Sequence, residues 1–271
     1  MKRLIDLGYF MGIKSAVSML LLTYSLNGSA QQLKFAMLQQ GESQNISMCV
    51  LLEAYRNIGI SVLFNAFPTT RSLKLSNSGV YDGETARVLA AQKKYTNLHP
   101  ITIPTLYMRG TAFTIKHTEF KPSGFESLAP FRVIIPKTVI FFERRTKDLP
   151  DVIKGTDFHA PFKMLAMGRG DVVASTYLAG VVSMRELRLK NVVALKPPIM
   201  EIPLHHFLNK KHQKLIPIIT AEMLKMQRSG RIEQIYQQYV TNLTDPNIEP
   251  DFNNGDPPSV PCPSTHKATA S

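Results

Sequence analysis

The sequence predicts an α/β protein with two sheet-centred lobes, because strand and helix patterns alternate in two separate parts of the chain. Residues 32–38 have the pattern of a strand, residues 46–58 carry apolar side chains at helical spacing before Gly59, and residues 60–67 are almost continuously apolar. A strand, a helix and a second strand in this order form the unit of a parallel sheet. The unbroken apolar run over 60–67 predicts a strand that is covered on both faces.

The middle of the chain repeats this order. Short apolar runs over 131–135 and 171–175 predict strands, and residues 161–167 and 177–189 have helical patterns. We therefore expect a second parallel unit in this region.

The last part of the chain predicts two helices on either side of Gly230 and then a tail. Apolar residues lie on one helical face before that glycine and continue at the same spacing after it: Leu215, Ile218, Ile219, Met223 and Met226, then Ile232, Ile235, Tyr236 and Tyr239. From Thr241 onward the composition changes to Pro, Asn, Asp, Ser and Thr. Residues 241–271 are therefore predicted to be a disordered tail.

The first thirty residues have the composition of a secretory signal peptide. Lys2, Arg3 and Lys14 are followed by an uncharged run over 15–26, and then by Gly28-Ser29-Ala30. The apolar run is shorter than the roughly 20 residues that span a bilayer. We expect cleavage after residues 1–30 and a soluble mature chain outside the cytoplasm. An uncleaved anchor or a buried helix is the alternative.

The chain is basic, with a formal net charge of +12. Residues 1–30 hold three of the basic residues and one acidic residue, which leaves the mature chain at +10. An exported protein meets little nucleic acid, so we expect no nucleic-acid partner. The excess charge instead favours anionic small molecules or surfaces.

Cysteine and histidine residues predict no metal site or cofactor. Export permits a disulfide between Cys49 and Cys262, but Cys262 lies in the predicted tail, and the sequence leaves the pairing open. His205 and His206 are adjacent, so on a strand they point to opposite faces and cannot share one metal.

Three stretches of sequence, taken in their order and spacing, carry a family resemblance. They are 53–87, which includes Phe67-Pro-Thr-Thr-Arg71 and Asp82-Gly-Glu-Thr-Ala-Arg87; 162–173, which includes Gly168-Arg-Gly-Asp171; and 203–212. Over about residues 32–240 the chain resembles the bacterial extracellular solute-binding proteins of family 3, in a compact branch.

The resemblance implies a fold, a location and a class of partner. The fold is the type II periplasmic-binding-protein-like one, in which two lobes are joined by two crossover strands and close on a ligand cleft. Lobe one would be 31–108 plus 206–240, and lobe two 109–205. The protein would be a periplasmic monomer without enzymatic activity. It would bind a small molecule, of the amino-acid kind in many members, for an ABC-type transporter or a sensor.

The resemblance also implies site residues in lobe one. Asp82 and Arg87 match a segment whose arginine grips the ligand carboxylate in amino-acid-binding members. A guanidinium fork suits a carboxylate, since it makes two parallel hydrogen bonds. The alternative for Arg87 is a salt bridge to Glu84 or Asp82. Arg71 follows Pro68 at a predicted helix start, where it could strengthen an anion site or lie free on the surface.

Lobe two departs from the pattern of amino-acid binders. Pro136-Lys137-Thr138 replaces the usual glycine and hydroxyl residue, although Thr138 could still cap a helix. Thr176 stands where many members have an aspartate for the ligand ammonium. A hydroxyl cannot pair with an ammonium as a carboxylate does, so a plain α-amino acid is doubtful. We expect a small anionic or carboxylate-bearing solute bound by Arg87, Arg71, Thr138, Thr176 and Asp82.

Two other classes of function stay open from the sequence. An exported accessory protein could keep the binding-protein fold and act through a protein partner. An enzyme ranks third, because Ser175 and Ser183 lack a recognisable nucleophile elbow or a partner histidine.

Overall fold

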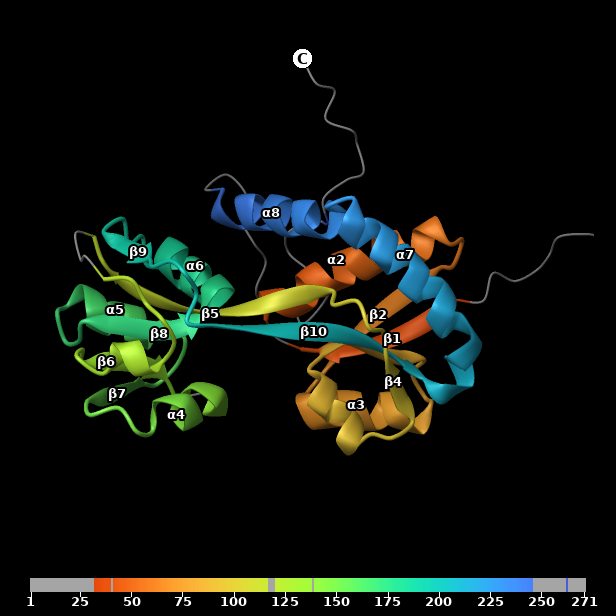
Figure 1. Ribbon diagram of the computed structural model, residues 1–271, viewed down its shortest axis with the longest axis horizontal. Coiled ribbons are helices and arrows are strands. Elements are labelled where there is room, and N and C mark those ends of the chain that lie inside the picture. Colours follow the sequence, from red (N-terminus) through yellow and green to blue (C-terminus); the bar gives the residue numbers. More distant parts are fainter. Residues whose placement is uncertain (1–31, 40, 117–119, 138, 246–261, 263–271) are drawn as a thin grey trace, which may run out of the picture. The chain divides into compact units, whose positions relative to one another are not determined.

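Two ten-residue strands, β5 (Leu106–Ile115) and β10 (Met200–Asn209), run side by side and connect two groups of shorter strands (Figure 1). The computed structural model describes residues 32–245 and 262, apart from 40, 117–119 and 138. In β10, residues 200–204 pair with β5, whereas residues 205–209 pair with strands of the first group. The strand β10 therefore belongs to both groups.

The first group consists of β1 (Leu33–Leu38), β2 (Val62–Phe67), β3 (Gly83–Arg87) and β4 (Leu98–Pro100). The strand β1 lies parallel to both β2 and β3, as the strand–helix–strand pattern predicts. The strands β3 and β4 pair with β10 in the antiparallel sense. Gly83 permits the close approach of β3 to β10, because a Cβ atom there would lie 2.1 Å from the Phe207 carbonyl oxygen.

The second group consists of β6 (Val133–Pro136), β7 (Val152–Gly155), β8 (Val172–Thr176) and β9 (Val192–Ala194). The strand β6 lies parallel to β7 and β8, and β5 pairs with β8 and β9 in the antiparallel sense. Hydrogen bonding therefore follows the order β2-β1-β3-β10-β5-β8-β6-β7, with β4 beside β10 and β9 beside β5. The described residues from 32 to 245 form one compact unit, and the predicted lobe limits stay a prediction.

Helices cover both groups of strands, and the predicted ones are confirmed within four residues at each end. They are α2 (Glu42–Asn57), α3 (Thr69–Ser78), α4 (Ile140–Thr146), α5 (Ala160–Ala166), α6 (Tyr177–Glu186), α7 (Ile216–Arg228) and α8 (Arg231–Thr244), with short 3₁₀ segments η1 (Leu89–Lys93), η2 (Glu126–Leu128) and η3 (Lys210–Leu215). The helices α7 and α8 pack along α2 (Figure 1). No helix of the described residues is long and apolar enough to cross a bilayer.

Separate cores lie beneath these helices. The largest joins the first group of strands to α2, α7 and α8 and contains the fully buried Phe35, Tyr55 and Tyr239. A second cluster includes Val133 and Phe142, and a third forms around the edge-to-face contact of Phe113 with Phe162. Each group of strands therefore has an apolar core of its own.

The prediction that residues 60–67 form a strand covered on both faces is wrong. The strand β2 stands at the end of the strand order and pairs with β1 alone among the described strands. Its side chains alternate between half-buried and exposed at first, and Leu63 is 44% exposed. A continuous apolar run predicts burial but does not show whether the strand lies at the edge of its sheet.

The predicted tail begins too early. The helix α8 continues four residues past 240, to Thr244, because Leu243 is fully buried in the first core. Its carbonyl oxygen also accepts a hydrogen bond of 2.7 Å from Arg185 Nη1. The rest of the predicted tail, except Cys262, and the predicted signal peptide lie outside the described residues.

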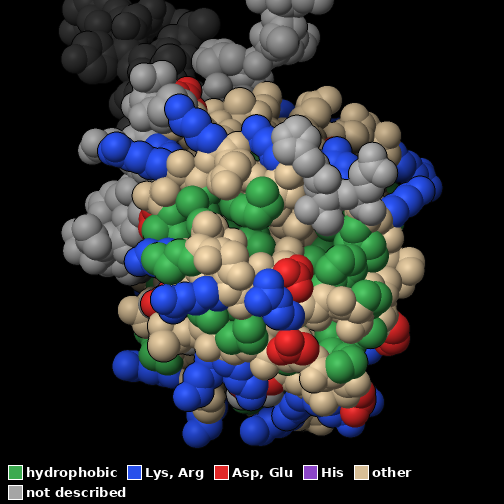
Figure 2. Space-filling view, turned by 90° about the vertical axis from the view of Figure 1, so that its left-hand side faces the viewer, with side chains coloured by type: hydrophobic (Ala, Val, Ile, Leu, Met, Phe, Trp, Pro, Cys, Tyr) green, Lys and Arg blue, Asp and Glu red, His purple; other side chains and the backbone are tan. Residues whose placement is uncertain are grey.

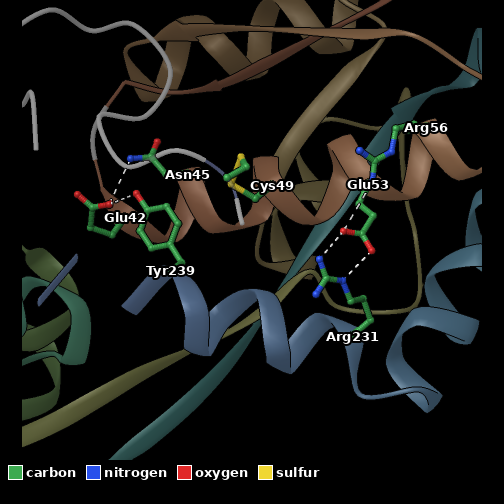
Figure 3. The surroundings of a disulfide bond; sticks show 8 residues. Glu42, Asn45, Cys49, Glu53, Arg56, Arg231 and Tyr239 are labelled. Carbon is green, nitrogen blue, oxygen red and sulfur yellow. Dashed lines mark hydrogen bonds and ion pairs between the residues drawn. A yellow bond between two sulfur atoms is a disulfide. The ribbon is translucent and has the colours of Figure 1, made fainter. Parts of the chain in front are cut away.

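Cys49 and Cys262 form a disulfide, which settles the pairing that the sequence leaves open. Their sulfur atoms are 2.08 Å apart and their Cα atoms 5.3 Å apart. Figure 3 shows the bond on α2, between two contacts of that helix with α8. On one side Glu53 accepts hydrogen bonds of 2.8 and 2.9 Å from Arg231, and on the other Tyr239 donates to Glu42.

We predict that Cys262→Ser lowers the free energy of unfolding by up to about 5 kcal/mol. The bond joins residues 213 positions apart, and closing so long a loop restricts the unfolded chain strongly. Denaturant titration of the mature protein checks this. A reducing agent should produce the same loss in the parent protein and none in the variant. A loss below about 1 kcal/mol would contradict the prediction.

A second buried constraint surrounds His206, which is fully buried in β10. Its Nδ1 lies 2.9 Å from the Glu84 carbonyl oxygen, so Nδ1 carries the proton and Nε2 accepts from the Tyr55 hydroxyl at 2.8 Å. Burial lowers the pKa of His206 from 6.5 to about 4, although its backbone hydrogen bonds oppose the shift. The folded protein therefore holds this histidine neutral.

We predict that the free energy of unfolding decreases as the pH is lowered from about 6.5 to about 4. In that window the unfolded chain protonates His206 and the folded chain does not, so acid favours unfolding by about 3 kcal/mol at pH 4. His206→Gln can keep both hydrogen bonds and should flatten this part of the profile. Urea titrations at successive pH values measure the slopes, and equal slopes in the parent and His206→Gln would refute the assignment.

Candidate functional site

The register of β5 and β10 makes the carboxyl ends of β3 and β8 point toward each other. Arg87, the last residue of β3, pairs with His205 of β10. Thr176, the last residue of β8, pairs with Gly110 of β5, and Gly110 pairs with Met200 of β10. The two positions on β10 are about 17 Å apart along the strand. Because β3 and β8 run in opposite directions, their carboxyl ends face the same stretch of β5 and β10.

The other parallel strands end at the same two edges. The strand β2 ends at Phe67 and leads into α3, and β6 and β7 end at Pro136 and Gly155 beside β8. Ligands of open α/β sheets bind outside the carboxyl ends of the strands. The residues that follow these ends therefore make up the candidate site.

Arg87 is in this region, but its guanidinium group already has a partner. Its Nη2 lies 2.6 Å from Glu84 Oε1 and 3.3 Å from Ser72 Oγ. Only 9% of the residue is exposed. Of the alternatives for Arg87 in the sequence, the salt bridge to Glu84 is therefore present, and the one to Asp82 is not.

Glu84 is the centre of a buried polar cluster. Both of its carboxylate oxygens accept hydrogen bonds from Ser72 Oγ, at 2.7 and 2.6 Å, and Oε2 accepts one from Ser76 at 3.2 Å. Burial raises the pKa of Glu84, while the charge of Arg87 and the two serines oppose that rise. The carboxylate is fully inaccessible to solvent, so the cluster holds it in a single place.

Two buried polar atoms near the strand ends have no hydrogen-bond partner among the described residues. They are Nε of Arg87 and Oγ of Ser175, which immediately precedes Thr176 on β8. Buried polar atoms are nearly always hydrogen-bonded, and exceptions gather at functional sites. One such atom therefore stands at each of the two facing strand ends.

Arg71 is exposed in the first turn of α3, at the same edge as Arg87. Its guanidinium carbon lies 5.5 Å from the centroid of the Phe67 ring, in a cation–π contact. The next residue, Ser72, contacts Arg87, so the first turn of α3 lies beside that arginine. Arg71 and Arg87 therefore share one part of the candidate site.

Thr176 caps α6. Its hydroxyl oxygen accepts a hydrogen bond of 3.3 Å from the Ala179 backbone N–H, and the residue is half-buried. The side chain therefore holds the helix start that faces β3. Thr138 lies outside the described residues, while its neighbour Lys137 is exposed after β6.

Asp82 lies at the other end of β3 from Arg87, so its prediction as a site residue is wrong. It precedes β3 and accepts from the Lys34 backbone N–H at 2.7 Å, near the amino end of β1. Lys211 and His212 each lie 2.7 Å from Asp82 Oδ1. Burial alone would raise the pKa of Asp82, but these hydrogen bonds outweigh it and lower the pKa. The carboxylate secures η3 at the opposite end of the strand.

Ser183 has a histidine partner that the sequence does not reveal. His159 Nδ1 lies 3.1 Å from Ser183 Oγ, and His159 Nε2 lies 3.0 Å from Glu186 Oε2. The order of these groups resembles a serine hydrolase triad. However, Ser183 is fully buried within α6, and its hydroxyl donates to the Phe158 carbonyl oxygen. Because this hydroxyl is already hydrogen-bonded within the protein, we assign the arrangement to packing.

Exposed apolar side chains also follow the carboxyl ends of β3 and β7. Val88 and Leu89, which follow Arg87, are 38% and 49% exposed, and Phe158, which follows β7, is 38% exposed. Away from this region, Figure 2 shows the outer end of the second group of strands, where Lys and Arg side chains are spread out with hydrophobic and acidic side chains between them. The described residues contain no group of three or more metal-binding side chains.

Comparison of the fold with solved structures finds many binding proteins. An ancestral cationic amino acid solute-binding protein matches with a TM-score of 0.60 and 16% identity, over 77% of this chain and 95% of that one. The GluR0 ligand-binding core in complex with L-glutamate matches with a TM-score of 0.59 and 14% identity, over 79% of this chain and 100% of that one.

Two further matched structures have names that refer to functions other than solute transport. A histidine kinase sensor domain with similarity to periplasmic binding proteins has a TM-score of 0.54 and 16% identity, over 77% of this chain and 95% of that one. A second structure of the first ancestral protein is described as a precursor of cyclohexadienyl dehydratase. No protein-family model matches the sequence, and no curated protein matches it. At these identities the likeness shows the fold alone, which is periplasmic-binding-protein-like of type II.

We predict that Arg87→Met lowers the free energy of unfolding by about 3–5 kcal/mol, because it leaves the buried Glu84 carboxylate without a cation. Combining it with Glu84→Gln should recover most of the loss. Arg71→Met, which removes an exposed arginine from the same edge, should cost less than about 1 kcal/mol. Chemical denaturation at neutral pH measures all three variants. A double variant as unstable as Arg87→Met would contradict the pairing.

Proposed function

We propose that this chain is an exported solute-binding protein of the periplasm. It captures a small carboxylate-bearing solute and presents it, as a monomer, to an ABC-type transporter or a sensor. The observation that carries the proposal is the convergence of the carboxyl ends of β3 and β8 on the crossing strands, with Arg87 at one of them. Such a position between two sheets suits a small-molecule site.

Several features support this proposal. The similar folds include proteins named for binding amino acids, and one is a sensor domain. Nε of Arg87, which is buried and has no hydrogen-bond partner within the described residues, offers a donor for a carboxylate. The first thirty residues carry the pattern of a signal peptide, which would place the mature chain outside the cytoplasm.

One observation favours the alternative, an exported accessory protein that acts through a protein partner. The guanidinium of Arg87 is already paired with Glu84, so the lobe-one anchor is not free. If no solute competes for that anchor, the fold serves as a scaffold only. The two functions therefore differ in whether a small molecule stabilises the native protein.

A thermal-shift screen of the mature protein distinguishes the two functions. Amino acids, short peptides and small carboxylates are added singly, and hits are measured by calorimetry. A solute that binds only the native state at 100 times its dissociation constant adds about 2.7 kcal/mol of stability. A carboxylate-bearing hit supports the proposal. No hit at 10 mM, together with recovery of a protein partner, would favour the accessory function.

We further predict that Thr176→Asp improves the affinity for zwitterionic amino acids relative to simple carboxylates. Aspartate can keep the hydrogen bond that caps α6, so the fold should be preserved. It also supplies the negative charge that an ammonium group needs. Calorimetry with alanine and propionate, which differ by that ammonium, measures the ratio. Thr176→Asn, which caps without charge, should leave the ratio unchanged. An unchanged ratio in Thr176→Asp would place Thr176 outside the site.

A further inference from the structure

The acidic residue of the lobe-one cluster stands beside the proposed ligand anchor. Glu84 is three residues before Arg87 on β3, and their side chains meet at 2.6 Å. Ser72 and Ser76 of α3 fix the carboxylate from the other side. The pair has no net charge, although the chain as a whole has an excess of positive charge.

We propose that Glu84 determines which ligand charges this site accepts. The inference rests on the proposed function. With Glu84 in place, the site takes a solute that carries one carboxylate and no second negative charge. Glu84 is thus a specificity-determining residue. It acts on the ligand through Arg87 and through the electrostatic effect of its own negative charge.

The first reason is competition for the guanidinium fork. A carboxylate that binds an arginine side-on needs Nε and Nη2 together. Nε of Arg87 has no partner in the part of the chain that the structure describes, but Nη2 already donates to Glu84 and contacts Ser72. A ligand carboxylate that binds side-on therefore shares Nη2 with Glu84, and we expect this to lower its affinity.

The second reason is the charge that remains near the bound ligand. Once a ligand carboxylate shares Arg87, two negative groups face one cation. Any further negative charge on the ligand is repelled by Glu84, and a positive one is attracted. Because the carboxylate is fully buried, counterions in solution screen this effect less than at an exposed site.

The test compares the mature protein with Glu84→Gln, using L-glutamate and L-arginine as probes. Glutamine has nearly the shape of glutamate. Its amide oxygen can accept from Ser72 and Arg87 at the Oε1 position, and its amide N–H can donate to Ser76, whose hydroxyl still donates to the Gly83 carbonyl oxygen. The variant loses the charge that pairs with Arg87, so it should be less stable than the parent but keep the fold. The two probes share the α-ammonium and α-carboxylate groups and differ in side-chain charge. Calorimetry should show at least about a tenfold rise in the affinity for L-glutamate relative to L-arginine.

A matched control separates this effect from a change in overall charge. Glu126→Gln alters the net charge equally, but at an exposed position in η2. It should leave the affinity ratio within twofold of the parent. Circular dichroism and thermal melting test whether both variants are folded.

The outcomes keep this inference apart from the proposed function. An unchanged ratio in folded Glu84→Gln would overturn the role of Glu84, and so would the failure of both proteins to bind either probe at 10 mM. A hit with another carboxylate in the thermal-shift screen would still leave the solute-binding function standing. If no solute binds at all, the proposed function fails as well.

Discussion

The register of β10 is the constraint on which the rest of the structure depends. Its first half pairs with β5 and its second half with β3 and β4, so one strand sets the positions of both groups. A slip by one residue would exchange its faces. His206 would then leave its contacts with Tyr55 and Phe35, and a polar group would enter the core unpaired. The same register places the ends of β3 and β8 opposite each other.

Buried polar groups collect where this register brings the strand ends together. Glu84, Arg87 and Ser72 form a hydrogen-bonded cluster, yet Nε of the same arginine lacks a partner among the residues that the structure describes. Replacing a buried ion pair by apolar residues often stabilises a protein, so such a pair is weak evidence for stability. The position of these groups at the facing strand ends agrees with the solute site that we propose.

The alternation of strands and helices could be predicted from the sequence, because apolar periodicity reflects burial directly. Which side chains lie near one another in the fold could not be predicted in this way. Asp82 and Arg87 are close in sequence, but a strand between them carries their side chains to opposite ends of the sheet. Ser72 has no motif of its own and joins the cluster only because α3 packs on β3. The Cys49–Cys262 pairing likewise depends on a Cα distance that composition does not contain.

The Glu84–Arg87 ion pair is compatible with a ligand site, even though it engages Arg87, the expected ligand anchor. An unpaired guanidinium that is nine-tenths buried would destabilise the unliganded protein by several kcal/mol. A binding protein must fold before it meets its solute, so such an arginine needs an internal partner. That partner then remains beside the ligand and influences its affinity. In the function that we propose, the interaction that stabilises the site before a ligand binds is therefore the same one that limits which solute binds.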